Sequence, residues 1–404
     1  MLATVAWRNV WRNKGRSGVV IGAMMVGIWA LAAGGGFMQS FLISYIESSI
    51  RYETSNGQIH HPEFTIDQDI QFTIHDQASI LTFLKEQPSI KEVCSRSIVN
   101  GMISSSRQAT GVRIVGVDPT EESHVTQLDS LVIAGEYFAN VTSNPVLIGE
   151  KLAEKLKVKV KSKVVITFQD VNGNITAGRF RVAGILHAAS LTINESSAYV
   201  KKEDINHLLG IDGHVHEIAY TTLEGTDDQA VADQLKKQFP DEKAESWKEL
   251  APELVFMQQL MGATLKILIV IIMAALAFGI VNTMLMAVLE RVRELGVLMA
   301  LGMRRNRVFM MIMIETLFLS TVGGPLGMLA GFFTISYLGK TGIDLSNYSA
   351  GLEAIGYESI LYPSLTPTDY IQIGIGVIIT AILAAIYPAW KAIKNDPVEA
   401  IHSL

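Results

Sequence analysis

Four long segments of the chain carry almost no charge, and this limits what it can fold into more than any other feature. Residues 17–46, 267–289 and 370–390 contain no Asp, Glu, Lys or Arg, and residues 308–339 contain only Glu315. A helix needs about 20 residues to cross the apolar core of a bilayer, and it satisfies its own backbone hydrogen bonds there. The sequence therefore predicts four transmembrane helices, because buried core helices of a soluble protein rarely have uncharged runs of this length.

The charges between these segments predict how the chain is oriented in the membrane. Residues 1–16 contain four basic residues and no acidic one, and residues 290–307 contain five Arg against two Glu. Short basic segments remain on the cytoplasmic side. We therefore expect both segments and the C-terminus to be cytoplasmic, and residues 47–266 and 340–369 to lie outside. The net charge of −6 argues against binding of nucleic acid.

The first residues predict a helix that lies along the membrane surface. Trp7 and Trp11 are four residues apart, as are Arg8 and Arg12. Tryptophan favours the headgroup region, and arginine extends towards lipid phosphates. A simple cytoplasmic anchor is the alternative interpretation, and the two overlap.

The segment between the first two predicted spans is long enough for a folded α+β domain. Residues 145–157 predict a strand followed by a helix, and Asn172-Gly173 between two β-like runs predicts a hairpin. Residues 226–239 predict a helix capped by Thr226 or Asp227. Residues 241–266 predict a helical stalk that returns to the membrane.

The motifs of catalysis are missing from this sequence, so we expect a non-catalytic membrane subunit. Gly339-Lys340-Thr341 lacks the earlier glycine of a phosphate-binding loop. No serine lies in the glycine pattern of a nucleophile elbow. His60-His61 and the pair His214 and His216, which would share one face of a strand, favour a structural or solvated role over metal binding. We expect Cys94 to be a buried small residue.

Glu315 is the one charged residue inside the third uncharged segment. Ionisable groups in lipid are costly and usually face protein or water. Glu315 is about two helical turns from Arg307, so it either lies near the cytoplasmic interface or pairs with an arginine there. A mechanistic role also remains open.

The segment after the second span has the pattern of a short helix lying along the membrane. Charged residues precede an apolar stretch that ends near Gly302, a residue that can terminate a helix. Such a helix could dock in a groove of a soluble partner. On spacing alone, a charged connector is an equally good interpretation.

Several stretches resemble one family of transporter subunits. ERVRELGVLMALGMRRNRVFMMIMIE (290–315) is similar to the FtsX/MacB permease signature of ABC transporters. The end PAWKAIKNDPVEAIHSL and the start AWRNVWRNKGRS resemble the termini of that family. VLIGEKLAEKLKVKV, FRVAGIL and AYVKKEDINHLLG resemble its periplasmic core domain. The whole chain is most similar to the LolC/LolE lipoprotein-releasing permeases.

The resemblance implies a fold. It indicates an α-helical membrane protein with four transmembrane helices plus a large extracytoplasmic α+β domain of the MacB periplasmic core type, inserted between helices 1 and 2. The expected segments are a cytoplasmic interfacial helix (1–16), transmembrane helix 1 (17–46), the periplasmic α+β domain with its stalk (47–262), transmembrane helix 2 (263–289), the cytoplasmic coupling segment (290–306), transmembrane helix 3 (307–338), a periplasmic loop (339–369), transmembrane helix 4 (370–390) and a cytoplasmic tail (391–404).

The resemblance also implies partners and a mechanism. A separate cytoplasmic ABC ATPase, acting as a dimer, would bind ATP and Mg²⁺, and this chain itself would hold no cofactor. A second copy or a related permease would complete the complex, in contact with membrane lipids and with lipoproteins as the expected cargo. The protein would lie in the bacterial inner membrane and pass ATP-driven motion to its periplasmic domain. Two rival functions remain open: MacB-like efflux of peptides, toxins or drugs, and FtsX-like regulation of a cell-wall hydrolase.

Two groups of residues are the candidates for these roles. The ATPase-docking group maps onto Glu290, Arg291, Arg293, Glu294, Leu295, Gly296, Leu298, Leu301 and Gly302. Acyl chains would enter between the first and second spans, where the candidate residues are Gly34, Gly35, Gly36, Phe37, Phe41, Met257 and Met261. A glycine run also permits ordinary close packing of helices.

Overall fold

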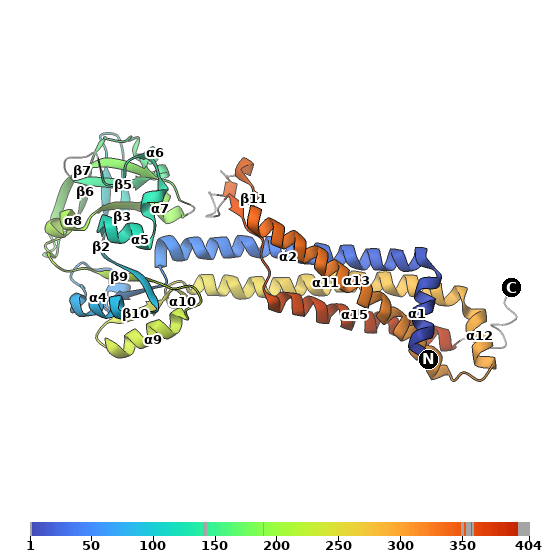
Figure 1. Cartoon of the computed structure of the whole chain (residues 1–404). Helices are drawn as coiled ribbons and strands as arrows, with labels where there is room; N and C mark the ends of the chain where they lie inside the picture. Colours follow the sequence, from blue (N-terminus) through green and yellow to red (C-terminus); the bar gives the residue numbers. More distant parts are fainter. Residues whose placement is uncertain are drawn as a thin grey trace. The chain divides into compact units, whose positions relative to one another are not determined.

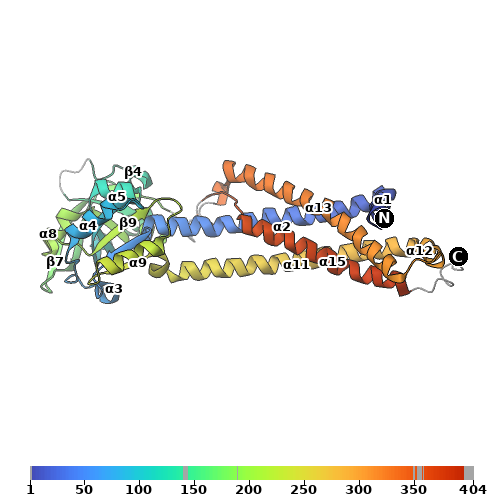
Figure 2. The ribbon, with the colours of Figure 1, turned by 60° about the horizontal axis from the view of Figure 1, so that its bottom comes forward.

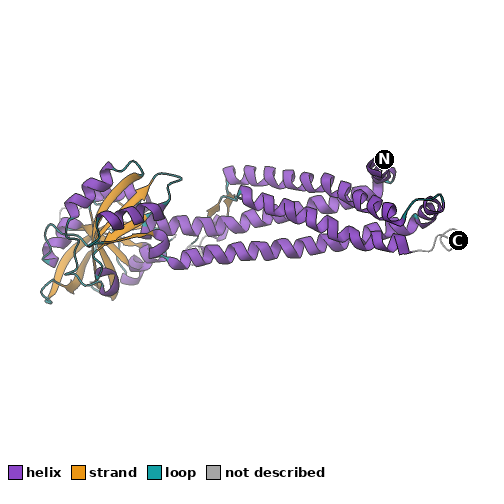
Figure 3. Ribbon diagram, turned by 90° about the horizontal axis from the view of Figure 1, so that it is seen from below, coloured by secondary structure: helices purple, strands orange, loops and turns teal. Residues whose placement is uncertain are grey.

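The computed structural model describes residues 2–139, 144–188, 190–348, 351–352, 357 and 359–394. The chain divides into two compact units. The helical unit takes in residues 1–42, 258–344 and 360–404, and the sheet unit takes in residues 43–257 and 345–359. The predicted tail motif after Lys394 lies outside the described residues. Figure 3 shows that nearly all strands belong to the sheet unit.

Helices make up most of the helical unit. The helices are α1 (Leu2–Arg12), α2 (Lys14–Ser49), α11 (Pro252–Glu290), α12 (Val292–Ala300), α13 (Arg305–Thr341) and α15 (Pro367–Lys394). Figures 1 and 2 show the four longest, α2, α11, α13 and α15, running side by side. A short strand pair, β11 (Ile343–Asp344) with β12 (Ile360–Leu361), follows α13. In length and composition α2, α11, α13 and α15 can each cross a membrane. The four predicted spans are confirmed in this sense.

Small residues on α13 let α2 approach it closely. Gly323, Gly327 and Gly331 recur every four residues and so share one helix face. A Cβ built on Gly327 would lie 2.8 Å from the backbone oxygen of Met25, and one on Gly331 would lie 2.6 Å from Cβ of Ala32. A larger residue at either glycine would have to push the two helices apart. Close packing through small residues is the usual way in which helices associate in lipid.

The sheet unit contains ten paired strands among the described residues. They are β1 (Gly57–His60), β2 (Ile90–Ser104), β3 (Ala109–Val117), β4 (Val132–Gly135), β5 (Pro145–Gly149), β6 (Lys163–Gln169), β7 (Ile175–Leu186), β8 (Ser197–Lys201), β9 (Glu217–Thr222) and β10 (Lys243–Ser246). The connecting elements are η1 (Ile50–Thr54), α3 (Phe64–Asp67), α4 (Gln77–Glu86), α5 (Pro119–Val125), η2 (Leu128–Leu131), α6 (Glu150–Leu156), α7 (Leu191–Ser196), α8 (Lys202–Leu209), α9 (Asp228–Gln238), α10 (Trp247–Leu250) and η3 (Ser346–Tyr348).

Six strands of this unit close into a ring. The pairings run β2–β3–β8–β5–β7–β6 and return from β6 to β2. Closing the sheet leaves no free edge among these six strands. The apolar side chains that alternate along the strands form one core, which includes Ile103, Ile114, Ile148, Ile166 and Val182.

A second core lies where β2 extends beyond the ring. There β2 pairs with β9, β9 pairs with β1, and β1 pairs with β10. Helices α4 and α9 cover these strands, since Ile80, Leu84, Val231 and Leu235 pack with Ile59 and Ile218. One long strand therefore serves two hydrophobic cores.

Most local predictions in this unit are confirmed. β5 and α6 follow one another as expected, and β6 and β7 form the hairpin at Gly173. Asp227 is the cap of α9, with its side chain accepting a hydrogen bond from the backbone N–H of Gln229. The continuous stalk predicted for 241–266 is wrong at its start, because residues 243–246 pair as β10 with β1 and the long helix begins only at Pro252. Strand pairing across the sheet prevails here over local sequence pattern.

Candidate coupling site

Two helix junctions of the helical unit face each other through opposite charges. α1 gives way to α2 after Arg12, and α11 gives way to α12 after Glu290. Nη2 of Arg12 lies 2.8 Å and 3.0 Å from the two carboxylate oxygens of Glu294, and Arg16 pairs with Glu290. We call these four residues the junction clamp. The hydrogen bonds that Arg12 donates to Glu294 hold the pKa of Glu294 below the ordinary value of a glutamate.

The clamp corrects one sequence-based expectation. Arg12 was predicted to extend towards lipid phosphates, but its guanidinium faces Glu294. Arg8, one turn earlier, is exposed and has no ion pair among the described residues. One guanidinium nitrogen of Arg12 donates to both carboxylate oxygens of Glu294, and the linear sequence does not reveal that partner 282 positions away.

Arg291 extends the charge network into α13. Its Nη1 lies 3.2 Å from Oε1 of Glu315, and its Nε lies 3.3 Å from Oε2 of Glu294. Glu315 is only 7% exposed. Burying a carboxylate is costly unless a cation and hydrogen bonds compensate for the lost water. The pairing with an arginine is one of the two alternatives given for Glu315, and the partner is Arg291 rather than Arg307.

A polar cavity of about 290 Å³ lies among these groups. Three arginines and three glutamates line it, so their formal charges cancel. The lining residues are Asn9, Arg12, Asn13, Arg16, Ser17, Val20, Thr283, Met284, Ala287, Glu290, Arg291, Glu294, Glu315 and Leu319. The helix ends of α1, α2, α11, α12 and α13 are therefore joined by charge as well as by apolar packing.

α12 has one face packed inward and another exposed. Leu295 and Gly296 are buried, with Leu295 in the apolar core of the helical unit. Arg293 is exposed, Val297 is 44% exposed and Leu301 is 81% exposed. The exposed face of α12 thus presents apolar side chains next to the charge of Arg293.

Gly302 ends α12 in the way that its position predicts. Its φ is +97°, which glycine adopts without steric penalty. Its N–H donates to the carbonyl of Met299, and the N–H of Met303 donates to that of Leu298. This is the pair of hydrogen bonds that closes many helix C-termini. The direction of α12 is therefore set before α13 begins.

An apolar groove of about 450 Å³ borders the exposed face of α12. Its lining combines apolar side chains with charged groups. The lining residues are Val5, Asn9, Arg12, Arg291, Arg293, Glu294, Val297, Leu298 and Met311. The groove therefore involves α1 as well as α12.

The predicted docking residues fall into two groups in the structure. Glu290, Arg293, Glu294, Leu301 and Gly302 are exposed. Leu295 and Gly296 are buried, and Arg291 and Leu298 are partly buried. In this conformation a partner could touch only the first group fully. Leu295 and Leu298 of the second group pack α12 against the rest of the helical unit, and α12 in turn carries or adjoins the exposed residues.

The glycine run in α2 also divides between two environments. A Cβ on Gly34 would meet nothing within 4 Å, whereas Gly35 and Gly36 are buried. The Cβ position of Gly36 lies 3.1 Å from Ile335 of α13, and that of Gly35 lies 3.4 Å from Leu265 of α11. Gly36 therefore packs against the third span, whereas Gly35 approaches the second.

The aromatic and methionine candidates for acyl-chain access lie on α2 and α11. Phe37 is 36% exposed, and its ring makes an edge contact with that of Phe41 at a centroid distance of 5.1 Å. Met257 and Met261 are both partly exposed. Met257 belongs to the sheet unit and Met261 to the helical unit. Their role remains a prediction.

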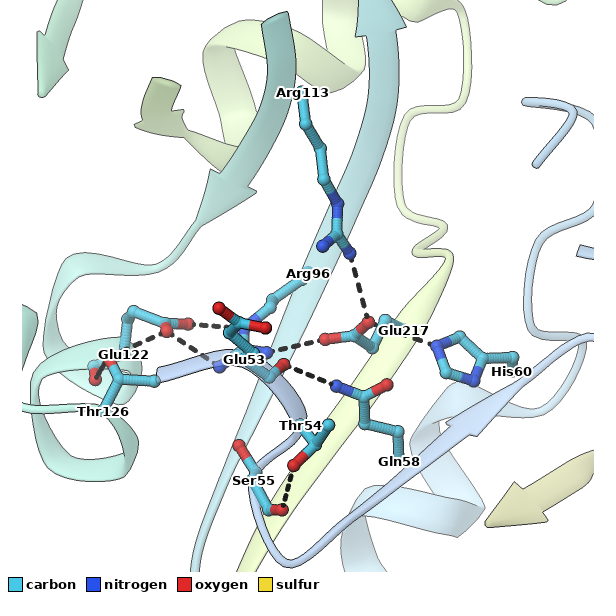
Figure 4. Close-up of polar contacts among 10 residues, drawn as sticks. All are labelled: Glu53, Thr54, Ser55, Gln58, His60, Arg96, Arg113, Glu122, Thr126 and Glu217. Atoms are coloured by element: carbon cyan, nitrogen blue, oxygen red, sulfur yellow. Dashed lines mark hydrogen bonds and ion pairs between the residues drawn. The ribbon is translucent and has the colours of Figure 1, made fainter. Parts of the chain in front are cut away.

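Sequence reasoning missed a cluster of buried charges in the sheet unit, which Figure 4 shows. Arg96 on β2 donates to both oxygens of Glu122 on α5, at 2.9 Å and 2.8 Å, and to Glu217 on β9 at 2.6 Å. Nε2 of His60 on β1 lies 3.1 Å from the other oxygen of Glu217. Arg96 is 5% exposed and both glutamates are 1% exposed. These residues are far apart in the chain, so no local pattern marks them as partners.

The electrostatics of this cluster favour its charged form. Burial opposes ionisation of Glu217, but Arg96 and His60 outweigh that effect and lower its pKa to about 2. Arg96 is also the residue at which β2 changes partners, because it is paired with Glu217 on β9 and with Val117 on β3. The cluster therefore ties together the point where the two cores of the sheet unit meet.

The histidines take structural positions. His214 and His216 do not share a face of a strand as predicted, since β9 begins only at Glu217. His216 is buried, accepts a hydrogen bond from the backbone N–H of Ile98 and has its other ring nitrogen 2.9 Å from the carbonyl of Ile70. His214 is exposed. Cys94 is a buried free thiol, as expected, and burial raises its pKa.

Two sequence families match this chain. The MacB-like periplasmic core domain matches residues 17–238, and the FtsX-like permease C-terminal family matches residues 266–397. The coupling site around α12 lies within the second match.

Individual relatives show how far the similarity extends. The lipoprotein-releasing system transmembrane protein LolC of Neisseria meningitidis is 23% identical over 99% of both chains. LolC of Haemophilus influenzae is 22% identical over 74% of this chain and 72% of its own. The macrolide export ATP-binding/permease protein MacB of Syntrophobacter fumaroxidans is 31% identical over 30% of this chain and 15% of its own.

Solved structures are similar only in part. The extracellular domain of the transporter YknZ from Gram-positive bacteria is 17% identical, with a TM-score of 0.32 over 47% of this chain and 98% of that domain. The periplasmic region of MacB from Actinobacillus actinomycetemcomitans is 13% identical, with a TM-score of 0.36 over 54% of this chain and 97% of that region.

Proposed function

Because this chain belongs to the FtsX/MacB family of ABC transporter permeases, we propose that it passes motion from a separate ATPase to its sheet unit. Its spanning helices and its relatives make it a bacterial inner-membrane protein. In this proposal both termini and α12 are cytoplasmic, and the sheet unit is periplasmic. ATP and Mg²⁺ bind to the partner ATPase, which acts as a dimer.

The observation that carries the proposal is the two-sided character of α12. One face is locked into the helical unit by Leu295, and the other exposes Arg293 and Leu301. A helix held rigidly on one side can transmit a push that a partner applies to the other. α12 also directly follows α11, which, like α2, runs from one unit into the other along the chain.

Purification with the ATPase of the same operon or complex tests the docking role. We expect Leu301→Asp with Arg293→Glu to reduce the amount of co-purified ATPase at least tenfold, because the first removes an apolar contact and the second reverses a charge. Ile175→Asp is the matched control, since Ile175 is an 83% exposed apolar residue of the sheet unit. Retention of the ATPase by the double variant would exclude this face as the docking surface.

We propose lipoproteins as the cargo. The support is the similarity to LolC, which extends over 99% of both chains, whereas the match to MacB covers only 15% of that longer protein. The proposed complex contains two permeases, as a homodimer or with a related subunit. In this proposal acyl chains enter between the first and second spans.

A photo-crosslinking amino acid at Gly34 tests the cargo. A side chain fits there without a clash, because nothing lies within 4 Å of the Cβ position. The same substitution at Gly279 on α11, which is equally open, is the control for general lipid exposure. We expect adducts with acylated lipoproteins at Gly34 only.

The same experiment separates the two rival functions. Adducts with exported peptides, toxins or drugs would indicate MacB-like efflux, which the similarity to MacB keeps as the second candidate. Absence of any cargo adduct together with binding of a cell-wall hydrolase would indicate regulation instead.

A further inference from the structure

We propose that α1 is a working part of the coupling element, held to α12 by the junction clamp. This inference rests on the proposed function. In it, Arg12 and Arg16 are positioning residues, which fix the α1–α2 junction to the α11–α12 junction. A displacement of α12 then moves α2 together with α11.

The geometry of the clamp supports this role. Arg12 and Arg16 lie on either side of the α1–α2 junction, Glu290 and Glu294 lie on either side of the α11–α12 junction, and the two pairs meet in opposite order. Two contacts, one on each side of the junctions, resist rotation as well as separation, whereas a single contact would act as a pivot. The clamp therefore constrains the direction of α12 relative to α2.

Apolar packing anchors α1 on its other side. Ala6 and Val10 are buried in the core of the helical unit, and the ring of Trp7 lies 5.3 Å from that of Phe318 on α13. α1 thus touches α13 through one face and α12 through its last residue. With these contacts α1 connects α13 to α12, in addition to any role as a membrane anchor.

The clamp is expected to contribute little to the stability of the fold. The side chains of Arg12 and Glu294 are 55% and 52% exposed, and those of Arg16 and Glu290 are 21% and 45% exposed. Exposed ion pairs contribute little to folding stability, because water screens them. Loss of the clamp is therefore expected to leave the helical unit folded. The more deeply buried pair of Arg291 and Glu315 separately joins the α11–α12 junction to α13.

Charge reversal tests the proposal in the complete complex with its ATPase. We expect Arg12→Glu with Arg16→Glu to retain the ATPase but to lower cargo-stimulated ATP hydrolysis at least tenfold. Arg12→Lys with Arg16→Lys, which keeps the charges, is expected to remain within about threefold of the wild type. The matched control is Arg8→Glu with Lys14→Glu, because both residues are exposed and have no ion pair among those of the described chain.

Hydrogen exchange provides a second measurement that needs no ATPase. The amides of α1 are expected to exchange faster in Arg12→Glu with Arg16→Glu than in the control pair, because only the former opens the clamp. The inference would be overturned if Arg12→Glu with Arg16→Glu showed the same cargo-stimulated ATP hydrolysis as the wild type. It would also be overturned if Arg8→Glu with Lys14→Glu lowered that hydrolysis as much. Failure of the wild-type chain to bind any ATPase would instead overturn the proposed function.

Discussion

At the scale of single residues, several charged side chains of the described chain are buried opposite a charge of the other sign. Arg96 lies between two buried glutamates of the sheet unit, and Arg291 contacts Glu315 in the helical unit. Removing one member of a buried pair leaves the other charge without compensation, which costs more than the pair itself contributes. These residues are therefore more sensitive to substitution than the exposed junction clamp.

Substitution of Arg96 tests this sensitivity. We expect Arg96→Ala to lower the free energy of unfolding by about 3–5 kcal/mol, because two buried carboxylates lose their cation. Arg107→Ala is the control, as this exposed arginine has no side-chain ion pair among the described residues. Denaturant unfolding of the full chain in detergent measures both, and similar stabilities of the two variants would refute the structural importance of the cluster.

The lowered pKa of Glu217 predicts a dependence of stability on pH. Its folded-state pKa of about 2 lies below the ordinary 4.5, so ionised Glu217 stabilises the fold above pH 4.5. That contribution is lost as the pH falls from about 4.5 towards 2. In thermal melts, the difference in melting temperature between the wild type and Glu217→Gln should therefore become smaller as the pH falls over this range.

The control for the pH series is Glu224→Gln, since Glu224 is exposed. Its melting temperature should follow that of the wild type at every pH. If the difference in melting temperature between the wild type and Glu217→Gln stayed constant down to pH 2.5, Glu217 would not be the group whose protonation lowers the stability.

At the scale of elements, helix packing depends on small residues at regular spacing. The glycines of α13 bring it against α2, and Gly36 of the run at 34–36 continues this contact, whereas Gly35 approaches α11. The sequence pattern alone left open whether that run serves acyl-chain access or packing. The structure supplies packing partners for Gly35 and Gly36 and leaves Gly34 open.

A single methyl group on α13 tests the packing. Gly327→Ala places Cβ at 2.8 Å from a backbone oxygen of α2, so the helices must separate. We expect a loss of about 1–3 kcal/mol in stability, as for other overpacked sites. Gly279→Ala on α11 meets open space and should be neutral or slightly stabilising, because alanine favours helix over glycine. Thermal unfolding in detergent compares the two, and equal effects would contradict close packing at Gly327.

At the scale of the whole molecule, the charge distribution predicts which parts face each compartment. Five arginines in 290–307 favour the cytoplasm, whereas acidic residues outnumber basic ones in 47–266. The helical unit carries the first segment and the sheet unit carries most of the second. The orientation of the termini remains a prediction.

Cysteine labelling of intact cells tests the orientation. The one native cysteine, Cys94, is buried with a raised pKa, so it reacts slowly. We expect a membrane-impermeant maleimide to label Ile175→Cys but not Leu301→Cys, although these positions are 83% and 81% exposed. Both should react after the membrane is made permeable. Labelling of Leu301→Cys in intact cells would reverse the predicted topology and end the proposed coupling mechanism.

Local sequence patterns account for much of the architecture. Uncharged segments predicted the spanning helices, Asn172-Gly173 predicted the β6–β7 hairpin, and Gly302 predicted the end of α12. Each of these features depends on residues close together in the chain. Prediction failed at 243–246, where the backbone pairs with a strand almost 190 residues earlier.

The candidate coupling site was only partly predictable for the same reason. The sequence located α12 and several of its exposed residues, but it did not show that Leu295 and Gly296 of the predicted docking group are buried against other helices. It also predicted that the side chain of Arg12 extends towards lipid rather than towards Glu294. The partners of these side chains lie on other helices, and no local pattern encodes which helix comes near.

The sequence by itself determined the class of the protein, its four spans and the kind of domain between the first two, because hydrophobicity and hydrogen-bonding needs in lipid act along the chain. Only the tertiary structure decided which charges pair. The junction clamp and the Arg96 cluster each join segments more than 100 residues apart in at least one contact. A buried charge is stable only if folding places a partner of opposite charge beside it. Its role therefore depends on the tertiary structure and not on its neighbours in the sequence.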